Sequence, residues 1–205
     1  MPNWCLTNYK IVGPKEDIRR FNDMLDDLSA LPEPRVENGF GKLWLGCLVD
    51  YLGGDWHDIY CRGEVCDRDT DMAGEMITLT VMSAWAEQAQ TRSFLQEKFP
   101  KCQFYYISEE PGNGYYIKND AENEFFPENF VLQYSVEEGS FDVEYFEDIR
   151  DIPPYLKENI GIKCKPDKDS VMKALDRWNA KNRAEGRFAY LNEFQLVDHG
   201  GYTVT

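Results

Sequence analysis

Residues 76–100 carry the clearest pattern of apolar and polar positions in the chain. From residue 77 to residue 85 the side chains alternate between two sets, which is the period of a half-buried strand. Thr91, Leu95 and Phe99 then recur at helical spacing, and a proline ends the helix. Because a strand followed by an amphipathic helix must bury its apolar face, we expect this stretch to pack within an α+β sheet structure.

The first 127 residues follow a strand, helix, strand, strand, helix, strand order. We expect strands at residues 4–12, 59–65, 76–85 and 102–108, and a return strand at 115–118 after a Pro-Gly-Asn-Gly turn. A first helix should start at Pro14 and end before Pro32, and residues 67–71 read as a polar turn. Residues 35–54 show no clear period, so we expect a loop with a short element. This order predicts a ferredoxin-like antiparallel sheet with helices on one face, residues 1–127.

The second part of the chain is more polar and predicts an α+β C-terminal extension, residues 128–205. Alternation at residues 130–136 and 141–146 around Gly139 predicts a hairpin. Residues 171–178 predict a helix that Asp167 caps and Gly186 closes, followed by strands within 188–204. We expect this extension to pack against the first domain.

Charge narrows the choice of partners. The chain has 37 acidic and 22 basic residues, a formal net charge of −15. This balance argues against direct nucleic-acid binding and against anionic membrane surfaces, since both need clustered Lys and Arg. Residues 120–151 hold eleven acids and one base, whereas residues 157–187 hold nine bases and five acids. Either the two runs attract each other, or the acidic run binds a basic protein partner through a surface that includes Glu137, Glu138, Asp142 and Glu144.

Compartment and redox state follow from what the sequence contains. The first residues lack the basic flank and apolar block of a signal peptide, and no apolar run reaches the ~20 residues that span a bilayer. The six cysteines are scattered in a chain without an export signal, so we expect reduced thiols and a cytoplasmic protein.

Candidate chemistry is sparse. His57, Cys61 and Cys66 lack the paired short spacings of a zinc site, and the Asp67-x-Asp69-x-Asp71 run lacks the Gly and acid of a calcium loop. Only two histidines are available to activate a nucleophile, and no phosphate or dinucleotide motif accompanies them. Adjacent Glu109 and Glu110 should point to opposite faces of a strand. We therefore expect no metal, no cofactor and no catalytic residue.

Two tryptophans stand beside polar residues at the edges of predicted elements. Trp56 is followed by His57, and Trp85 precedes Glu87 by two positions. Such residues either cover a sheet edge or line a groove for a small ligand or peptide. In the second interpretation the groove lies near Trp56, Trp85 and Glu109.

With these residues in place, the chain resembles the YubB-like ferredoxin-fold family of uncharacterised phage- and plasmid-borne proteins. The residues that carry the resemblance are Met1-Pro2-Asn3-Trp4-Cys5, Asn8, Val12-Gly13-Pro14, Gly54-Asp55-Trp56, Ser83-Ala84-Trp85, Phe99-Pro100, and Tyr106, Glu109, Gly112, Gly114 and Tyr116. The resemblance covers roughly the first 120 residues. It implies a ferredoxin-like fold and an association with mobile elements, but no reaction.

Together these observations favour a non-enzymatic, acidic protein-binding module. Since acidic proteins of mobile elements sometimes inhibit host nucleases or defence complexes, the resemblance also suggests a decoy or inhibitor of a basic or nucleic-acid-handling host protein. The alternative is a small-ligand or peptide-binding protein that uses the tryptophan groove.

Overall fold

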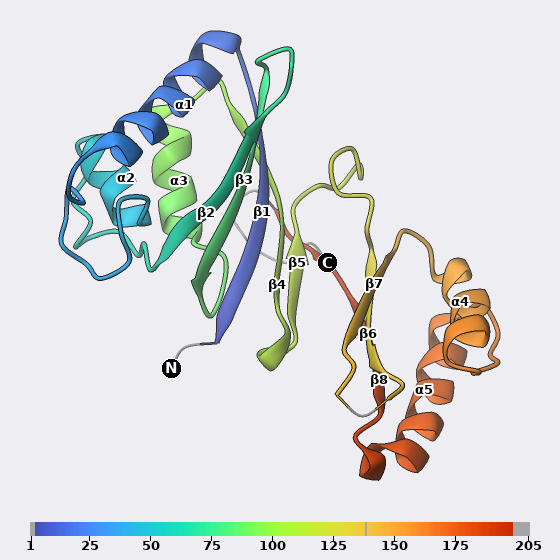
Figure 1. Ribbon diagram of the computed structural model, residues 1–205. Coiled ribbons are helices and arrows are strands. Elements are labelled where there is room, and N and C mark those ends of the chain that lie inside the picture. Colours follow the sequence, from blue (N-terminus) through green and yellow to red (C-terminus); the bar gives the residue numbers. More distant parts are fainter. Residues whose placement is uncertain (1–2, 138, 199–205) are drawn as a thin grey trace. The chain divides into compact units, whose positions relative to one another are not determined.

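The computed structural model describes residues 3–137 and 139–198. The chain forms two compact units, the first from residues up to 125 together with those from 195 onward, the second from residues 126–194. Both units combine helices with a mainly antiparallel sheet (Figure 1), so the predicted α+β class is confirmed.

The first unit contains a six-stranded sheet in the order β2-β3-β1-β4-β5-β9. Neighbouring strands are antiparallel, except that β9 runs parallel to β5. The strands are β1 (Trp4–Val12), β2 (Gly63–Thr70), β3 (Met76–Ala84), β4 (Gln103–Glu110), β5 (Tyr115–Lys118) and β9 (Gln195–Leu196). The helices are α1 (Lys15–Ala30), α2 (Leu45–Tyr51) and α3 (Ala89–Lys98), and a 3-10 turn spans Pro111–Asn113.

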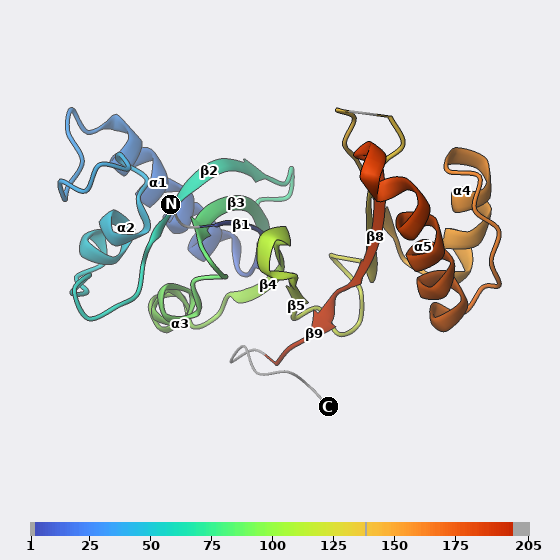
Figure 2. The same ribbon diagram turned by 90° about the horizontal axis from the view of Figure 1, so that it is seen from below.

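All three helices lie on one face of this sheet (Figures 1 and 2). Odd-numbered positions of β1 and β3 point toward them, which explains why Ile11, Ile77 and Leu79 are buried. The apolar side of α1, including Phe21 and Leu25, fills the space between helix and sheet. The even-numbered positions of both strands form an open face on the other side of the sheet.

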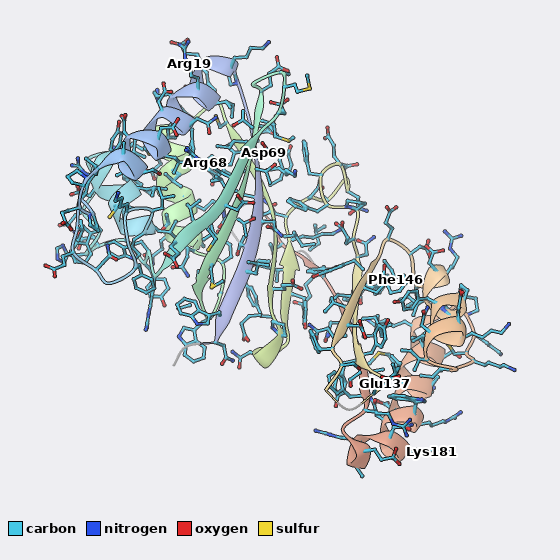
Figure 3. All side chains as sticks on the ribbon, viewed as in Figure 1. Arg19, Arg68, Asp69, Glu137, Phe146 and Lys181 are labelled. Carbon is cyan, nitrogen blue, oxygen red and sulfur yellow. The ribbon has the colours of Figure 1, made fainter. Side chains whose placement is uncertain are left out.

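The second strand differs from its prediction. It begins at Gly63 and runs to Thr70, so the stretch expected as a polar turn is strand, and the turn follows at Asp71. Residues 67–70 pair with β3, and Arg68 attaches this part of the strand to α1 through an ion pair with Asp26 and a bond to the Asn22 carbonyl at 3.2 Å. Arg68 and Asp69 lie on opposite sides of β2 (Figure 3), as strand geometry requires.

The stretch 43–52, expected as loop with a short element, contains α2.

The second unit is a three-stranded antiparallel sheet in the order β7-β6-β8 with two helices on one face (Figure 1). Its elements are β6 (Phe130–Ser135), β7 (Asp142–Phe146), α4 (Ile152–Asn159), α5 (Lys168–Asn182) and β8 (Phe188–Glu193), with 3-10 turns at Ile149–Asp151 and Arg183–Glu185. Leu132, Leu156 and Val171 are fully buried between sheet and helices. Asp167 caps α5 by accepting a bond from the Ser170 N–H at 2.8 Å, as predicted.

The predicted division at residue 127 falls close to the boundary between the units, but the end of the chain departs from it. Residues 195–196 were expected in the extension, whereas they form β9 beside β5 of the first unit. The short Gln195–Leu196 segment carries no alternation, and only its pairing with Ile117 and Lys118 defines it as a strand. Within the described residues, the structure has no helix whose length and apolar character would let it cross a bilayer.

A buried ion pair joins the loop after β3 to the start of α3. Arg92 Nε lies 3.0 Å from Glu87 Oε1, and the two side chains are 1% and 2% exposed. Tyr9 of β1 donates its hydroxyl to the same carboxylate oxygen at 2.6 Å. The Arg92 guanidinium also stands 5.0 Å from the centre of the Tyr106 ring on β4. The Glu87–Arg92 ion pair therefore links β1, β4, the loop after β3 and α3.

Arg92→Met should destabilise the protein strongly, because it leaves the Glu87 carboxylate buried without its counter-charge. We expect the free energy of unfolding to fall by about 3–5 kcal/mol. Urea denaturation measures the change, and Arg19→Met, which removes an exposed arginine from α1, should alter stability by less than about 0.5 kcal/mol. Equal effects of the two substitutions would contradict the structural role of the pair.

Stability should also fall at alkaline pH. Burial, and then the Glu87 carboxylate, raise the pKa of Tyr9 well above its ordinary value. The unfolded chain therefore releases this proton near pH ~10 while the folded chain retains it, so stability is complete below that pH and declines above it. Urea denaturation between about pH 8 and 11 should show this decline. Tyr9→Phe should flatten the curve, whereas Tyr190→Phe, at an exposed position of β8, should leave its slope unchanged.

Candidate functional site

A hollow lined with aromatic rings lies beside the start of β2. It has a volume of about 540 Å³ and is open to solvent. Five rings contribute to its wall, accompanied by Asp58, Arg62 and Gln90 as the charged and amide groups. The rings belong to Phe40, Trp44, Trp56, His57 and Tyr60. We call this feature the aromatic hollow.

A tight turn presents two of these rings. The Asp58 N–H bonds the Asp55 carbonyl at 3.1 Å, and the Asp55 carboxylate accepts the His57 N–H at 2.9 Å. The same carboxylate oxygen lies 2.8 Å from His57 Nδ1. These bonds from His57 lower the pKa of Asp55. As a result, the His57 ring is held flat against Trp56, with the ring centres 3.7 Å apart.

Close packing behind the turn fixes Trp56. Its ring meets the edge of Trp44 at 5.3 Å and 72°. Gly54 precedes the turn where a Cβ atom would stand 2.6 Å from the Phe94 ring and 2.8 Å from the Val49 side chain, so a larger residue fits only if these side chains move. Trp44 is 7% exposed, and its Nε1–H is buried without a hydrogen-bond partner. The wall of the hollow is therefore preformed and contains an unused donor.

The residues around the start of α3 hold the opposite wall. The Gln90 side chain accepts the Tyr60 N–H at 2.6 Å, and the Thr91 hydroxyl donates to the Tyr60 carbonyl at 2.9 Å. Gln88 accepts the Arg62 N–H at 2.9 Å. These bonds satisfy the backbone of residues 60–62, which belongs to no strand. Of the strand expected at 59–65, residues 63–65 pair with β3 as part of β2, whereas residues 60–62 are positioned largely by these side chains.

The structure separates the residues that were expected to share a groove. Trp56 and His57 line the aromatic hollow, but Trp85 and Glu109 are not among its lining residues. Trp85 follows the end of β3 and is 46% exposed. Glu109 points to the open face of the sheet, since its neighbour Glu110 is buried on the helix-covered face and caps the next turn. The predicted grouping is corrected accordingly.

The acidic residues expected to form one surface have different environments. Glu137, labelled in Figure 3, stands in the exposed turn between β6 and β7, and Asp142 is exposed at the start of β7. Glu138 lies outside the described residues. Glu144 pairs across the sheet with buried Leu132, so its carboxylate is half-buried on the helix side. There it helps to raise the pKa of Tyr155, which burial raises most. Glu144 is therefore not part of a free acidic surface.

The ion pairs of the second unit bear on the idea that its acidic and basic runs attract each other. Asp148 pairs with Arg150 and Glu185 with Arg187, each within two residues along the chain. Lys168 at the start of α5 pairs with Glu193 of β8. None of these three pairs joins the run at 120–151 to the run at 157–187, so the attraction stays a prediction.

A buried row of small polar side chains is the second candidate for a reactive site. Cys5 Sγ lies 3.0 Å from Ser108 Oγ, which is 2.8 Å from Thr7 Oγ1. Burial raises the pKa of Cys5, so its thiol stays protonated and is a poor nucleophile. The three side chains of the row satisfy one another's hydrogen-bonding groups within the buried face of the sheet. Among the described residues, no group of three or more His, Cys, Asp or Glu side chains is arranged to hold a metal ion.

Sequence reasoning missed Phe40, Trp44, Arg62 and Gln90. Phe40 and Trp44 lie in the stretch at 35–54 that shows no period, and they meet Trp56 only through the fold. The one available signal was the density of aromatic residues between positions 40 and 60. Comparison with protein-family models, with curated proteins and with solved structures returns no match for this chain.

Proposed function

We propose that the protein is a non-enzymatic binding module that holds a basic segment of a partner protein in the aromatic hollow. The observation that carries the proposal is the preformed wall of five rings around an open volume of about 540 Å³. Trp, Tyr and Phe faces attract Lys and Arg side chains, most strongly when the cation loses part of its water. Pockets of this size are typical of ligand sites.

The charge of the first unit supports a basic partner. It contains 23 acidic and 12 basic residues, a formal net charge of −11. The second unit contributes only −4, from 14 acidic and 10 basic residues. Within the lining, Asp58 offsets Arg62, so the long-range attraction comes from the unit as a whole. Such attraction accelerates encounter and weakens with salt.

The order of strands and helices in the first unit supports the predicted ferredoxin-like fold. Four strands and two helices of the first unit follow the β1-α1-β2-β3-α3-β4 order, with β1 between β3 and β4. We assign this part to the ferredoxin-like arrangement, extended by α2, β5 and β9. Membership of the YubB-like family, an origin in a mobile element and a decoy role stay proposals that rest on the residues of the first 120 positions.

Arrayed octapeptides test the proposed function. Each peptide carries a central Arg-Arg, Lys-Lys, Glu-Glu or Ser-Ser pair with only Ser and Gly on either side. We expect the protein to retain the Arg and Lys peptides, and Trp56→Ala to weaken that retention about tenfold through loss of the cation–ring contact. Retention should also fall as salt is raised.

The matched control is Tyr190→Ala, which removes an exposed ring from the second unit and should leave retention unchanged. Thermal unfolding followed by far-ultraviolet circular dichroism checks that both variants keep the fold. If the Glu peptides are retained as well as the Arg peptides, or if Trp56→Ala binds like the parent protein, the proposed function is wrong.

A further inference from the structure

A second cluster of exposed apolar residues lies at the end of the same sheet. Trp4 and Leu6 of β1 and Met82 of β3 are 44%, 36% and 36% exposed on the open face. Leu6 and Met82 are cross-strand partners, and Trp4 pairs with Ala84. Trp85 follows directly and is 46% exposed. We call these four side chains the apolar end patch. A run of large exposed apolar groups marks an interaction site more often than a structural one.

The backbone at the patch is in an unfavourable conformation. Trp85 has φ = 72°, in the left-handed region that bulky residues rarely adopt. Its N–H bonds the Asn3 carbonyl at 2.9 Å, which anchors the strained residue to the start of β1. The Trp85 side chain is nevertheless exposed and belongs to neither apolar core of the protein. Strain of this kind accumulates at functional positions.

Phe40 connects the patch to the aromatic hollow. Its ring belongs to the wall of the hollow, and its edge meets the Trp4 ring at a centre distance of 6.4 Å. The apolar surface therefore continues from Trp56 and Trp44 through Phe40 to Trp4. Asn8 and Thr80, the next residues of the open face along β1 and β3, are polar and bond each other at 2.9 Å, which ends the patch.

We infer that the partner segment extends from the hollow across Phe40 onto the apolar end patch, and that it carries apolar residues beside its basic ones. This extension of the site rests on the proposed function. The four side chains of the patch carry no charge, so they select for apolar partners, while the net charge of −11 on the unit favours a basic one. An extended basic segment with neighbouring Leu, Ile or Phe meets both requirements.

The test uses octapeptides that keep a central Arg-Arg pair and carry either Leu and Phe or Ser and Gly on one side. We expect the parent protein to prefer the apolar set about tenfold, since burying one large side chain supplies this factor. The double variant Leu6→Thr with Met82→Thr should lose that preference and still prefer Arg over Glu. Threonine suits an exposed strand position, so the fold should be kept.

The two proposals fail in different ways. An apolar preference that survives in the double variant would overturn the extended site and leave the hollow as the whole site. No preference for Arg over Glu in the parent protein would overturn both. As a matched control, Tyr145→Thr with Tyr190→Thr removes two exposed strand side chains from the second unit and should preserve both preferences.

Trp85→Gly separates a binding role of this residue from a structural one. Glycine adopts φ = 72° without strain, so the melting temperature should stay level or rise. The preference for apolar octapeptides should fall at the same time. A lower melting temperature with unchanged preference would show that Trp85 serves the fold and would remove it from the proposed site.

Discussion

The buried ion pair between Glu87 and Arg92 is the interaction on which the first unit depends. Two charges lose nearly all their water there, and their mutual contact, the Tyr9 hydroxyl, the Gln96 side chain and the Tyr106 ring help to offset that cost. An apolar pair of similar volume would bind helix to sheet as well. What the ion pair adds is a single geometry, because Nε of Arg92 and the Tyr9 hydroxyl meet at one carboxylate oxygen. The loop between β3 and α3 is therefore fixed in position.

The loop between β3 and α3 determines the shape of the aromatic hollow. Gln88, Gln90 and Thr91 follow Glu87 directly and hold the backbone of residues 60–62 by three hydrogen bonds. Trp85 precedes Glu87 by two residues, so its strained conformation depends on the same anchored segment. A substitution that frees the ion pair should thus disturb binding as well as stability, although neither partner lines the surface of the hollow.

Residues 4–12 and 76–84 were predicted closely because one face of each strand is buried, and burial imposes the alternation that a sequence shows. The second half of β2 was not predicted, and α2 was expected only as a short element of unspecified type within a loop. Arg68 is stabilised by Asp26, 42 residues away, and no local pattern records such a contact. The same distinction between local pattern and long-range contact applies to the candidate site. Trp56 and His57 could be identified from their polar neighbours, whereas Trp44 and Phe40 join them only through tertiary packing.

Charge and aromatic contact act at different distances, which explains why the two hypotheses drawn from the sequence are compatible. The field of an acidic unit reaches about 8 Å in physiological salt and attracts any basic chain. Contact with a ring acts within about 6 Å of its centre and requires a defined pose. Under the proposed function, the field would set how often a basic segment arrives, and the rings that line the hollow would set how long it stays. In that case selectivity among basic partners would come from uncharged surface, and the exposed side chains of Trp4, Leu6, Met82 and Trp85 are the proposed source of it.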